Sequence, residues 1–234
     1  MLGYAERMGY LARNPADAVE KPRDDTGERT VYTPEQVRQF VAALEGDRLR
    51  ALWFLALSAG LRRGELGGLQ WRDVDLDGAR PKVAVRTTRT SVGNRVVVDS
   101  PKSKSSRRVV YLDNGTAGML DQHRVEMMAE AELRGESHLP KYVCVDEFGD
   151  PYHPNRLTRS LHTLQREAGL PEITLHDLRH TAATIALLAG VHPKVVSERH
   201  GHASTQITLD RYSHVVEAMQ HEAAEAIGQF LQPG

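Results

Sequence analysis

A change of hydrophobic pattern near the middle of the chain most constrains its fold. Between Trp71 and Leu112, the β-branched runs KVAVRT, NRVVV and RRVVYL are separated by turn residues. Such runs are typical of short antiparallel strands. On both sides of this region, apolar residues recur with the spacing of helices. The pattern therefore predicts an α+β chain that is mainly α, with many helices around one small antiparallel β-sheet.

Helix boundaries are clearest where capping residues accompany the apolar spacing. Thr33, Pro34 and Gln36 fit the N-cap, N1 and N3 positions of a capping box, which predicts a helix beginning at Pro34. Other helices are expected at about 4–12, 48–58, 63–69, 116–134, 154–168, 177–189, 193–199 and 213–230. Polar residues at about 20–30 indicate a linker, and VCVDEFGDPY indicates a short strand and turn.

Composition excludes several classes of protein. The chain has 234 residues, enough for one large domain with a sizeable core. No apolar run approaches the ~20 residues that a membrane span needs, and the N-terminus is too polar for a secretory signal. The single cysteine, Cys144, excludes an internal disulfide framework and fits a reducing cytoplasm, which is the localisation we expect.

Charge is unevenly distributed, although the net charge is only −1. The segment from Arg86 to Arg108 holds seven basic residues and one acidic residue, Asp99. After Val216 there are three glutamates and neither lysine nor arginine. A chain that segregates its charge in this way can present a cationic face to a polyanion such as nucleic acid. The alternative for this feature alone is a solvated hairpin surface.

Five short motifs carry residues suited to phosphoryl chemistry. In chain order they are SAGLRRGELGGL with Arg62, PKSKSSRR with Lys102, LHDLRHTAAT with His176 and Arg179, HGHAS with His202, and QITLDRYSHV with Tyr212. This ordered set resembles the catalytic set of the tyrosine recombinase (phage integrase) family. That set is an arginine, a lysine on a β-hairpin, a His-x-x-Arg, a histidine or tryptophan, and a tyrosine. The resemblance covers about residues 30–234 and implies a multihelical tyrosine-recombinase catalytic domain.

The resemblance implies a site-specific DNA recombinase, an integrase that cleaves and rejoins DNA through a 3′-phosphotyrosyl intermediate. The implied catalytic residues are Arg62, Lys102, His176, Arg179, His202 and Tyr212, with Glu65 in support. Neither metal nor ATP is expected, and no cofactor. The implied partners are double-stranded DNA at a recombination site, three further copies of the chain in a homotetramer on synapsed DNA, and accessory DNA-bending or directionality factors. No membrane partner is expected.

Phosphodiester cleavage explains why these residue types occur together. A planar guanidinium donates two parallel hydrogen bonds to phosphate oxygens and keeps its charge, which suits Arg62 and Arg179. A lysine can protonate the leaving 5′-oxygen, because its pKa falls when it is desolvated near other cations. His176 is expected to exchange the tyrosine proton, and His202 to hydrogen-bond the phosphate. Glu65, one helical turn after Arg62, is expected to orient the cationic groups.

Some assignments have alternatives. Lys104 lies two residues after Lys102 on the same loop, and Lys102 is preferred as the catalytic lysine. Lys104, together with Arg107 and Arg108, is then expected to bind DNA. His176 and His180 have the i, i+4 spacing of a zinc-binding helix, and His200 or His202 would complete such a site. A zinc hydrolase leaves Arg62, the lysine loop and Tyr212 unexplained.

Two departures from the family pattern concern the N-terminus and His200. Residues 1–28 are expected to be a remnant of the last helix of a core-binding domain plus a linker, and 29–234 the catalytic domain. The alternative function is therefore a truncated DNA-binding remnant of a mobile-element integrase without full recombination activity. His200 stands where the family commonly has an apolar residue, which is expected to loosen the local packing.

Overall fold

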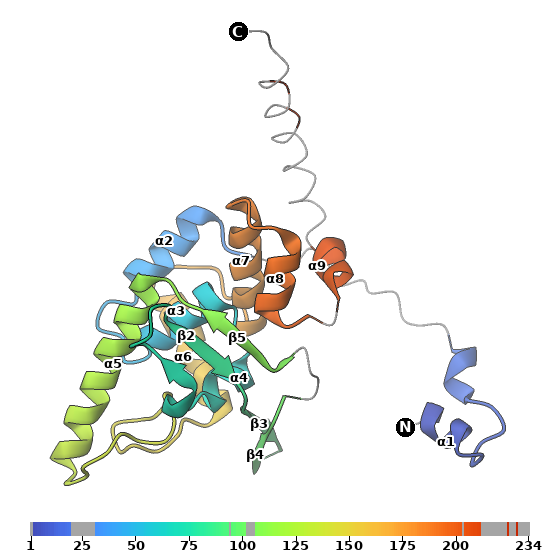
Figure 1. Ribbon diagram of the computed structural model, residues 1–234, viewed down its shortest axis with the longest axis horizontal. Coiled ribbons are helices and arrows are strands. Elements are labelled where there is room, and N and C mark those ends of the chain that lie inside the picture. Colours follow the sequence, from blue (N-terminus) through green and yellow to red (C-terminus); the bar gives the residue numbers. More distant parts are fainter. Residues whose placement is uncertain are drawn as a thin grey trace.

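The computed structural model of this chain is mainly helical, with a small amount of β-structure (Figure 1). The structure describes residues 2–19, 31–93, 95–101, 106–202 and 204–211, together with Ala224 and Gly228. The helices are α1 (Leu2–Arg7), η1 (Pro15–Ala18), α2 (Pro34–Ala42), α3 (Arg50–Ala59), α4 (Arg63–Gly68), η2 (Trp71–Asp73), α5 (Asn114–Leu133), α6 (Pro154–Glu167), α7 (Leu175–Leu188), α8 (Pro193–His200) and α9 (Thr205–Arg211). The strands are β1 (Val74–Asp75), β2 (Lys82–Val85), β3 (Thr88–Val92), β4 (Arg95–Asp99) and β5 (Arg108–Tyr111).

The strands form two antiparallel sheets rather than one. Strands β1, β2 and β5 make a three-stranded sheet in which Val83 pairs with Val110, and β3 and β4 make a separate hairpin. Strand β3 packs on α4 instead of extending the first sheet. Arg89 of β3 anchors it there, because its Nη1 donates to the carbonyls of Gly67 and Tyr152 at 3.4 and 3.0 Å. The fold class is otherwise as predicted, mainly helical with little β-structure.

Helix α3 forms the centre of the core. Its buried residues are Ala51, Leu52, Trp53, Leu55, Ala56 and Ala59. The helix packs against both α5 and α7 (Figure 1). Burial of each large apolar side chain contributes about 1.5–3 kcal/mol, so α3 holds the surrounding elements together. None of the helices in the described part of the chain is long and apolar enough to cross a membrane.

Capping residues mark helix starts as the sequence predicts, and sometimes more sharply. The Thr33–Gln36 capping box of α2 is confirmed. Helix α7 begins two residues earlier than expected, because Thr174 and Asp177 form a second capping box. The structure adds α9, which has seven residues, two of them threonines, and packs against α8. Threonine is a weak helix former, so the local sequence gave little indication of α9.

Other expectations differ or lie outside the described residues. Helix α1 ends at Arg7 rather than near residue 12. The segment VCVDEFGDPY makes only an isolated bridge between Val145 and Pro151, and proline cannot donate a second ladder bond. The expected linker at 20–30 falls outside the described part of the chain. The same holds for the expected helix at 213–230, apart from Ala224 and Gly228.

The end of α3 is joined tightly to the end of α8. Gly60 caps α3 in the left-handed conformation, with φ 59° and ψ 37°. A Cβ on Gly60 would lie 2.4 Å from Nε2 of the buried His200 ring. The two His200 ring nitrogens lie 3.1 Å from the Val196 carbonyl oxygen and 3.3 Å from that of Arg179. His200 therefore fills this junction, and the expected loosening of the packing is not observed.

Burial makes His200 a poor base. Desolvation, followed by the nearby charges of Arg179 and His202, lowers the pKa of His200 well below its ordinary value, although its hydrogen bonds to two carbonyls act in the opposite direction. The folded protein therefore keeps this imidazole neutral at a pH where the unfolded chain binds a proton.

We expect Gly60→Ala to destabilise the protein and Gly118→Ala to leave it unchanged or more stable. The Gly60 variant combines a positive φ with a collision against His200. Gly118 lies within α5 with nothing within 4 Å of an added Cβ, so alanine there favours the helix by roughly 0.5–1 kcal/mol. Denaturant unfolding of both variants measures the difference. Equal stability of the two would contradict this account of the junction.

We expect acid to destabilise the wild-type protein more steeply than His200→Leu. Below the unfolded-state pKa of about 6.5, His200 is protonated in the unfolded chain but stays neutral in the folded protein. The free energy of unfolding therefore falls as pH falls. Leucine removes up to one proton from this linkage, about 1.36 kcal/mol per pH unit at most. Denaturant unfolding at pH 5 to 8 measures the two slopes. His123, whose pKa is lowered by burial, remains in both proteins and leaves a residual slope. Identical slopes would show that His200 is not the neutral group.

Candidate functional site

The structure brings Arg62, Glu65, Arg179 and His202 of the predicted catalytic set together around the end of α8, and His176 lies three residues before Arg179 on α7. They come from the start of α4, the first half of α7 and the turn after α8, as Figure 1 shows for the helices themselves. The described members are Arg62, Glu65, His176, Arg179 and His202. Lys102, Lys104 and Tyr212 lie outside the described residues, so their assignments stay predictions.

Helix α8 ends in a Schellman motif. Gly201 adopts the left-handed conformation, with φ 62° and ψ 46°. The N–H of His202 donates to the Ser197 carbonyl at 3.0 Å, and that of Gly201 to the Glu198 carbonyl at 3.0 Å. This motif satisfies the carbonyls of residues 197 and 198. The next three carbonyls, of residues 199–201, need partners from elsewhere.

Three arginines supply those partners, one for each successive carbonyl. Arg108 Nε donates to the Arg199 carbonyl at 2.5 Å, and Arg179 Nη2 donates to the His200 carbonyl. Arg62 Nη2 donates to the Gly201 carbonyl at 3.1 Å. The carboxyl end of a helix carries partial negative charge, which favours cations at this position. Helix α8 thereby gathers guanidinium groups from β5, α7 and the start of α4.

Glu65 neutralises part of this positive charge. Its side chain is only 2% exposed, and its two carboxylate oxygens accept from Nη1 and Nη2 of Arg108 at 2.9 and 3.0 Å. The same carboxylate accepts from the backbone N–H and Nη1 of Arg62, both at 2.8 Å. Burial alone would raise the pKa of Glu65. The hydrogen bonds and charge of Arg108, with those of Arg62, outweigh burial and hold the pKa below its ordinary value.

Arg62 is the most accessible of the three arginines. It is the N-cap residue of α4, and Glu65 at N3 reaches back to its backbone N–H, which is one half of a capping box. The Arg62 side chain is 38% exposed, against 6% for Arg108. Its guanidinium is therefore oriented by Glu65 and Gly201 while still reaching solvent.

Helix α7 contributes one buried and one exposed member of the site. Arg179 is 2% exposed and donates to the carbonyls of Gly60 and His200, so it joins the ends of α3 and α8. His176 lies three residues earlier and is exposed. Its ring meets that of buried His180 edge-on, with centroids 4.5 Å apart. The three-residue spacing thus places His176 and Arg179 on one side of the helix.

His202 is held from the far side of the turn. Its Nδ1 lies 2.8 Å from the hydroxyl of Thr208 on α9, a partner that the sequence analysis missed. This contact joins the turn after α8 to α9, which ends at Arg211, directly before Tyr212 in the sequence. Within the described ranges, no three His, Cys, Asp or Glu side chains are grouped to hold a metal ion. The zinc alternative therefore gains no support there.

The basic segment from Arg86 to Arg108 is only partly a surface feature. Arg89 is buried, at 6% exposed, with its guanidinium 5.0 Å from the Tyr142 ring centroid. The Arg108 side chain, for which the sequence predicts a DNA-binding role, is only 6% exposed, because Glu65 holds its guanidinium inside the site. Arg107 is exposed, as expected, and donates to the Ser100 hydroxyl at 3.1 Å. Arg86, Arg107 and Arg108 are among the residues that line an open groove beside β2 and β5.

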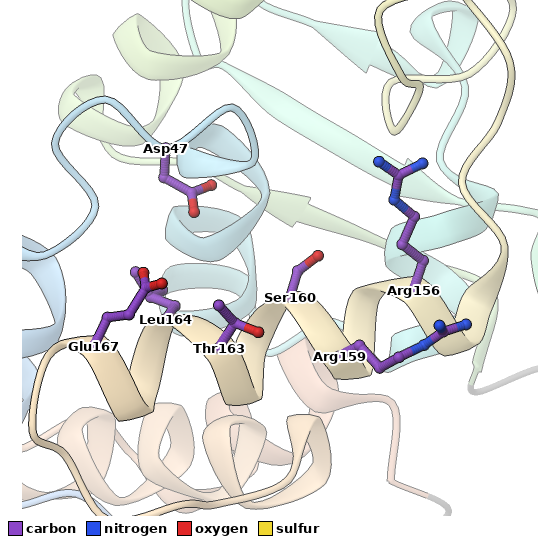
Figure 2. Close-up of a pocket in the computed structure, with 7 residues that line it drawn as sticks. All are labelled: Asp47, Arg156, Arg159, Ser160, Thr163, Leu164 and Glu167. Carbon is purple, nitrogen blue, oxygen red and sulfur yellow. The ribbon is translucent and has the colours of Figure 1, made fainter.

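A second groove lies along α6 and has a different character (Figure 2). Arg156 and Arg159 lie at one end of it, and Asp47 and Glu167 lie at the other, as Figure 2 shows. Its lining includes none of the three arginines at the end of α8, Arg62, Arg108 and Arg179, which form the arginine cluster. The opposed charges make it less suited than the cluster to a polyanion.

The arrangement suits an anion with several oxygen atoms. Three guanidinium groups and one carboxylate leave an excess of positive charge, and the donors are held by backbone carbonyls before any ligand arrives. Preorganised donors of this kind stabilise charge that develops on phosphoryl oxygens. His202 is half-buried in the turn after α8, and the exposed His176 lies three residues before Arg179 on α7. Both imidazoles can exchange protons or donate hydrogen bonds.

Comparison with known proteins agrees with this chemistry. The chain is 32% identical to a "Tyrosine recombinase XerC-like" protein of Caldanaerobacter subterraneus subsp. tengcongensis, over 97% of this chain and 63% of the relative. It is 26% identical to the "ICEBs1 integrase" of Bacillus subtilis, over 94% of this chain and 60% of the relative. The chain thus spans less than two thirds of the length of these relatives.

The fold also matches a solved structure, that of the Tn1549 transposon integrase in complex with transposon right end DNA. The TM-score is 0.73 at 22% sequence identity, over 95% of this chain and 75% of the other. A family model described as "Phage integrase family" matches residues 30–219. With the motifs, the arginine cluster and this match over most of its length, the chain belongs to the phage integrase family.

Proposed function

We propose that this chain is the catalytic part of a site-specific DNA recombinase, an integrase that cleaves and rejoins DNA through a 3′-phosphotyrosyl intermediate. The observation that carries the proposal is the convergence of Arg62 and Arg179 on the end of α8, beside His202. A phosphodiester carries the charge and the oxygen atoms that such donors recognise. The names of the relatives, a tyrosine recombinase and an integrase, support the same reaction class.

In the proposed reaction the Tyr212 oxygen attacks phosphorus and the bond to the 5′-oxygen breaks. His176 accepts the tyrosine proton, and Lys102 donates a proton to the departing 5′-oxygen. Arg62, Arg179 and His202 bind the phosphoryl oxygens, on which negative charge grows in the transition state. Rejoining reverses these transfers and attacks the phosphotyrosyl bond with a 5′-hydroxyl. The bond energy is conserved, so the proposal needs neither ATP nor a metal.

The proposal extends to domains and partners. Residues 29–234 act as the catalytic domain, and residues 1–28 as the last helix of a core-binding domain plus a linker. Arg107 and Lys104 contact DNA phosphates beside the site, and four copies of the chain assemble on synapsed DNA in the cytoplasm, with accessory DNA-bending or directionality factors. The solved Tn1549 transposon integrase in complex with transposon right end DNA supports DNA as the partner.

A second candidate function is a DNA-binding remnant without full recombination activity. Covalent attachment to DNA separates the two candidates, because a remnant that only binds DNA forms no phosphotyrosyl bond.

We expect Tyr212→Phe to abolish covalent attachment to DNA while non-covalent binding stays nearly unchanged, because only one hydroxyl is lost. The measurement is trapping on a nicked suicide substrate that carries the cognate site, followed by gel separation and mass spectrometry. Tyr111→Phe is the matched control, since its ring is exposed on β5, and it should keep the adduct. An undiminished adduct with Tyr212→Phe, or one mapped to Tyr32 or Tyr111, would overturn the assignment.

We expect the cleavage defect of Lys102→Ala to be rescued by a substrate with a 5′-sulfur leaving group, because a thiolate departs without a proton. Lys104→Ala should show a weaker defect that sulfur does not rescue. Single-turnover cleavage of oxygen- and sulfur-linked substrates measures both. Rescue of Lys104→Ala and not of Lys102→Ala would move the role of general acid to Lys104.

A further inference from the structure

Arg107 and Arg108 are adjacent in the sequence but lie in opposite environments. Successive side chains of a strand point to opposite faces. Strand β5 obeys this rule, since Val110 is buried while Val109 and Tyr111 are exposed. Arg107 falls on the exposed side, and Arg108 falls on the side that faces the interior. Although the two arginines are neighbours in the sequence, only Arg107 is exposed to solvent, and Arg108 contacts other groups of the protein.

The Arg108 guanidinium is largely occupied by the protein itself. Its Nε donates to the Arg199 carbonyl, its Nη1 to Glu65 and to the Ser106 carbonyl at 3.2 Å, and its Nη2 to Glu65. A guanidinium has five N–H donors. Four hydrogen bonds within the protein already use most of these donors, so Arg108 has little capacity left for a phosphate.

Glu65 accepts hydrogen bonds from both Arg108 and Arg62, so the orientation of Arg62 depends on Arg108. Arg108 holds both oxygens of the carboxylate, and the same two oxygens hold the backbone N–H and the guanidinium of Arg62. Arg108 also fixes β5 to the end of α8, which holds the other side of Arg62 through Gly201. Arg62 is thus oriented by Glu65 on one side and by the Gly201 carbonyl on the other. Arg108 contacts both Glu65 and the end of α8 that carries Gly201.

We propose that Arg108 is a positioning residue, which sets the Arg62 guanidinium through Glu65 and the end of α8 and does not itself contact DNA. The role rests on the proposed function, since it is defined by the phosphate that Arg62 would bind. Arg108 lies six residues after Lys102, so it also ties the strand that follows the lysine-bearing loop to the same carboxylate.

The first experiment compares Arg108→Met with Arg107→Ala in DNA binding over a range of salt concentrations. Each phosphate contact contributes about 0.9 to the slope of log K against log salt. Arg107→Ala should weaken binding and reduce this slope. Arg108→Met should leave the slope unchanged but lower the rate of single-turnover cleavage at saturating DNA by at least about tenfold, because small misplacements of a positioned group cost up to ~10²-fold.

The second experiment measures the pH profile of that cleavage step. Among the described residues, the charged groups that contact Glu65 are Arg62, at the start of α4, and Arg108 of β5. Without Arg108, burial raises the pKa of Glu65, so the acid limb of the profile should move to higher pH. Arg108→Lys keeps one cation and should move the limb less. In a protein that already carries Glu65→Gln, adding Arg108→Met should not move the acid limb further. Arg107→Ala should leave the acid limb in place, both in the wild-type protein and in the Glu65→Gln variant.

These outcomes decide the proposal even if Arg108→Met does not fold. Arg108→Lys then carries the test, and an unchanged salt slope with a raised acid limb supports the positioning role. A slope reduced by about 0.9, as for a phosphate contact, overturns it. So does a slower cleavage with an unmoved acid limb, which a purely structural defect would give.

The proposed function can fail separately. If the wild-type protein forms no covalent adduct, the recombinase proposal fails, while the pKa of Glu65 is still measurable by carboxyl-carbon NMR. A higher Glu65 pKa in Arg108→Lys than in the wild-type protein then supports the link from Arg108 to Glu65. An unchanged pKa overturns it.

Discussion

The meeting of three arginines with the carboxyl end of α8 is the interaction on which the site depends. Guanidinium groups of like charge repel one another, and each loses hydration when it is brought into a protein. Here the carbonyls of residues 199–201 and the carboxylate of Glu65 compensate for that loss. The oriented dipoles of α8 add a favourable field. A cationic site is thereby assembled from segments up to 139 residues apart in the chain.

The same junction explains why the core and the site are one structure. Arg179 joins the end of α3 to the end of α8, and Arg199 donates to the carbonyls of Ser58 and Tyr111, which lie on α3 and β5. His200 fills the space beside Gly60, where a side chain would not fit. Helix α3, which forms the centre of the core, therefore also contacts the residues that hold the arginine cluster.

Much of the fold was predictable because local signals agreed with the tertiary structure. The capping box at Thr33 placed α2, and the β-branched runs placed β2, β4 and β5. The ordered motifs indicated the family and which described side chains would meet. The role of Arg108 was not recognised, although the alternation of β5, with Val110 facing the core, already indicated an inward side chain. Arg89 was missed because its partners are backbone carbonyls, which no motif reveals. The places of Lys102 and Tyr212 stay predictions.

The carbonyls that hold the arginines belong to the main chain, which has a consequence for how such a site tolerates change. Replacing the side chains of Arg199 or His200 leaves their carbonyl oxygens in the polypeptide. The acceptor in each of these arginine hydrogen bonds therefore cannot be deleted by a point mutation, and alanine scanning does not detect it. Gly201 is the exception, because its left-handed conformation aims the end of the helix. Substitutions along α8 that preserve its packing against α3 and β5 therefore leave the carbonyls that hold the arginines in place.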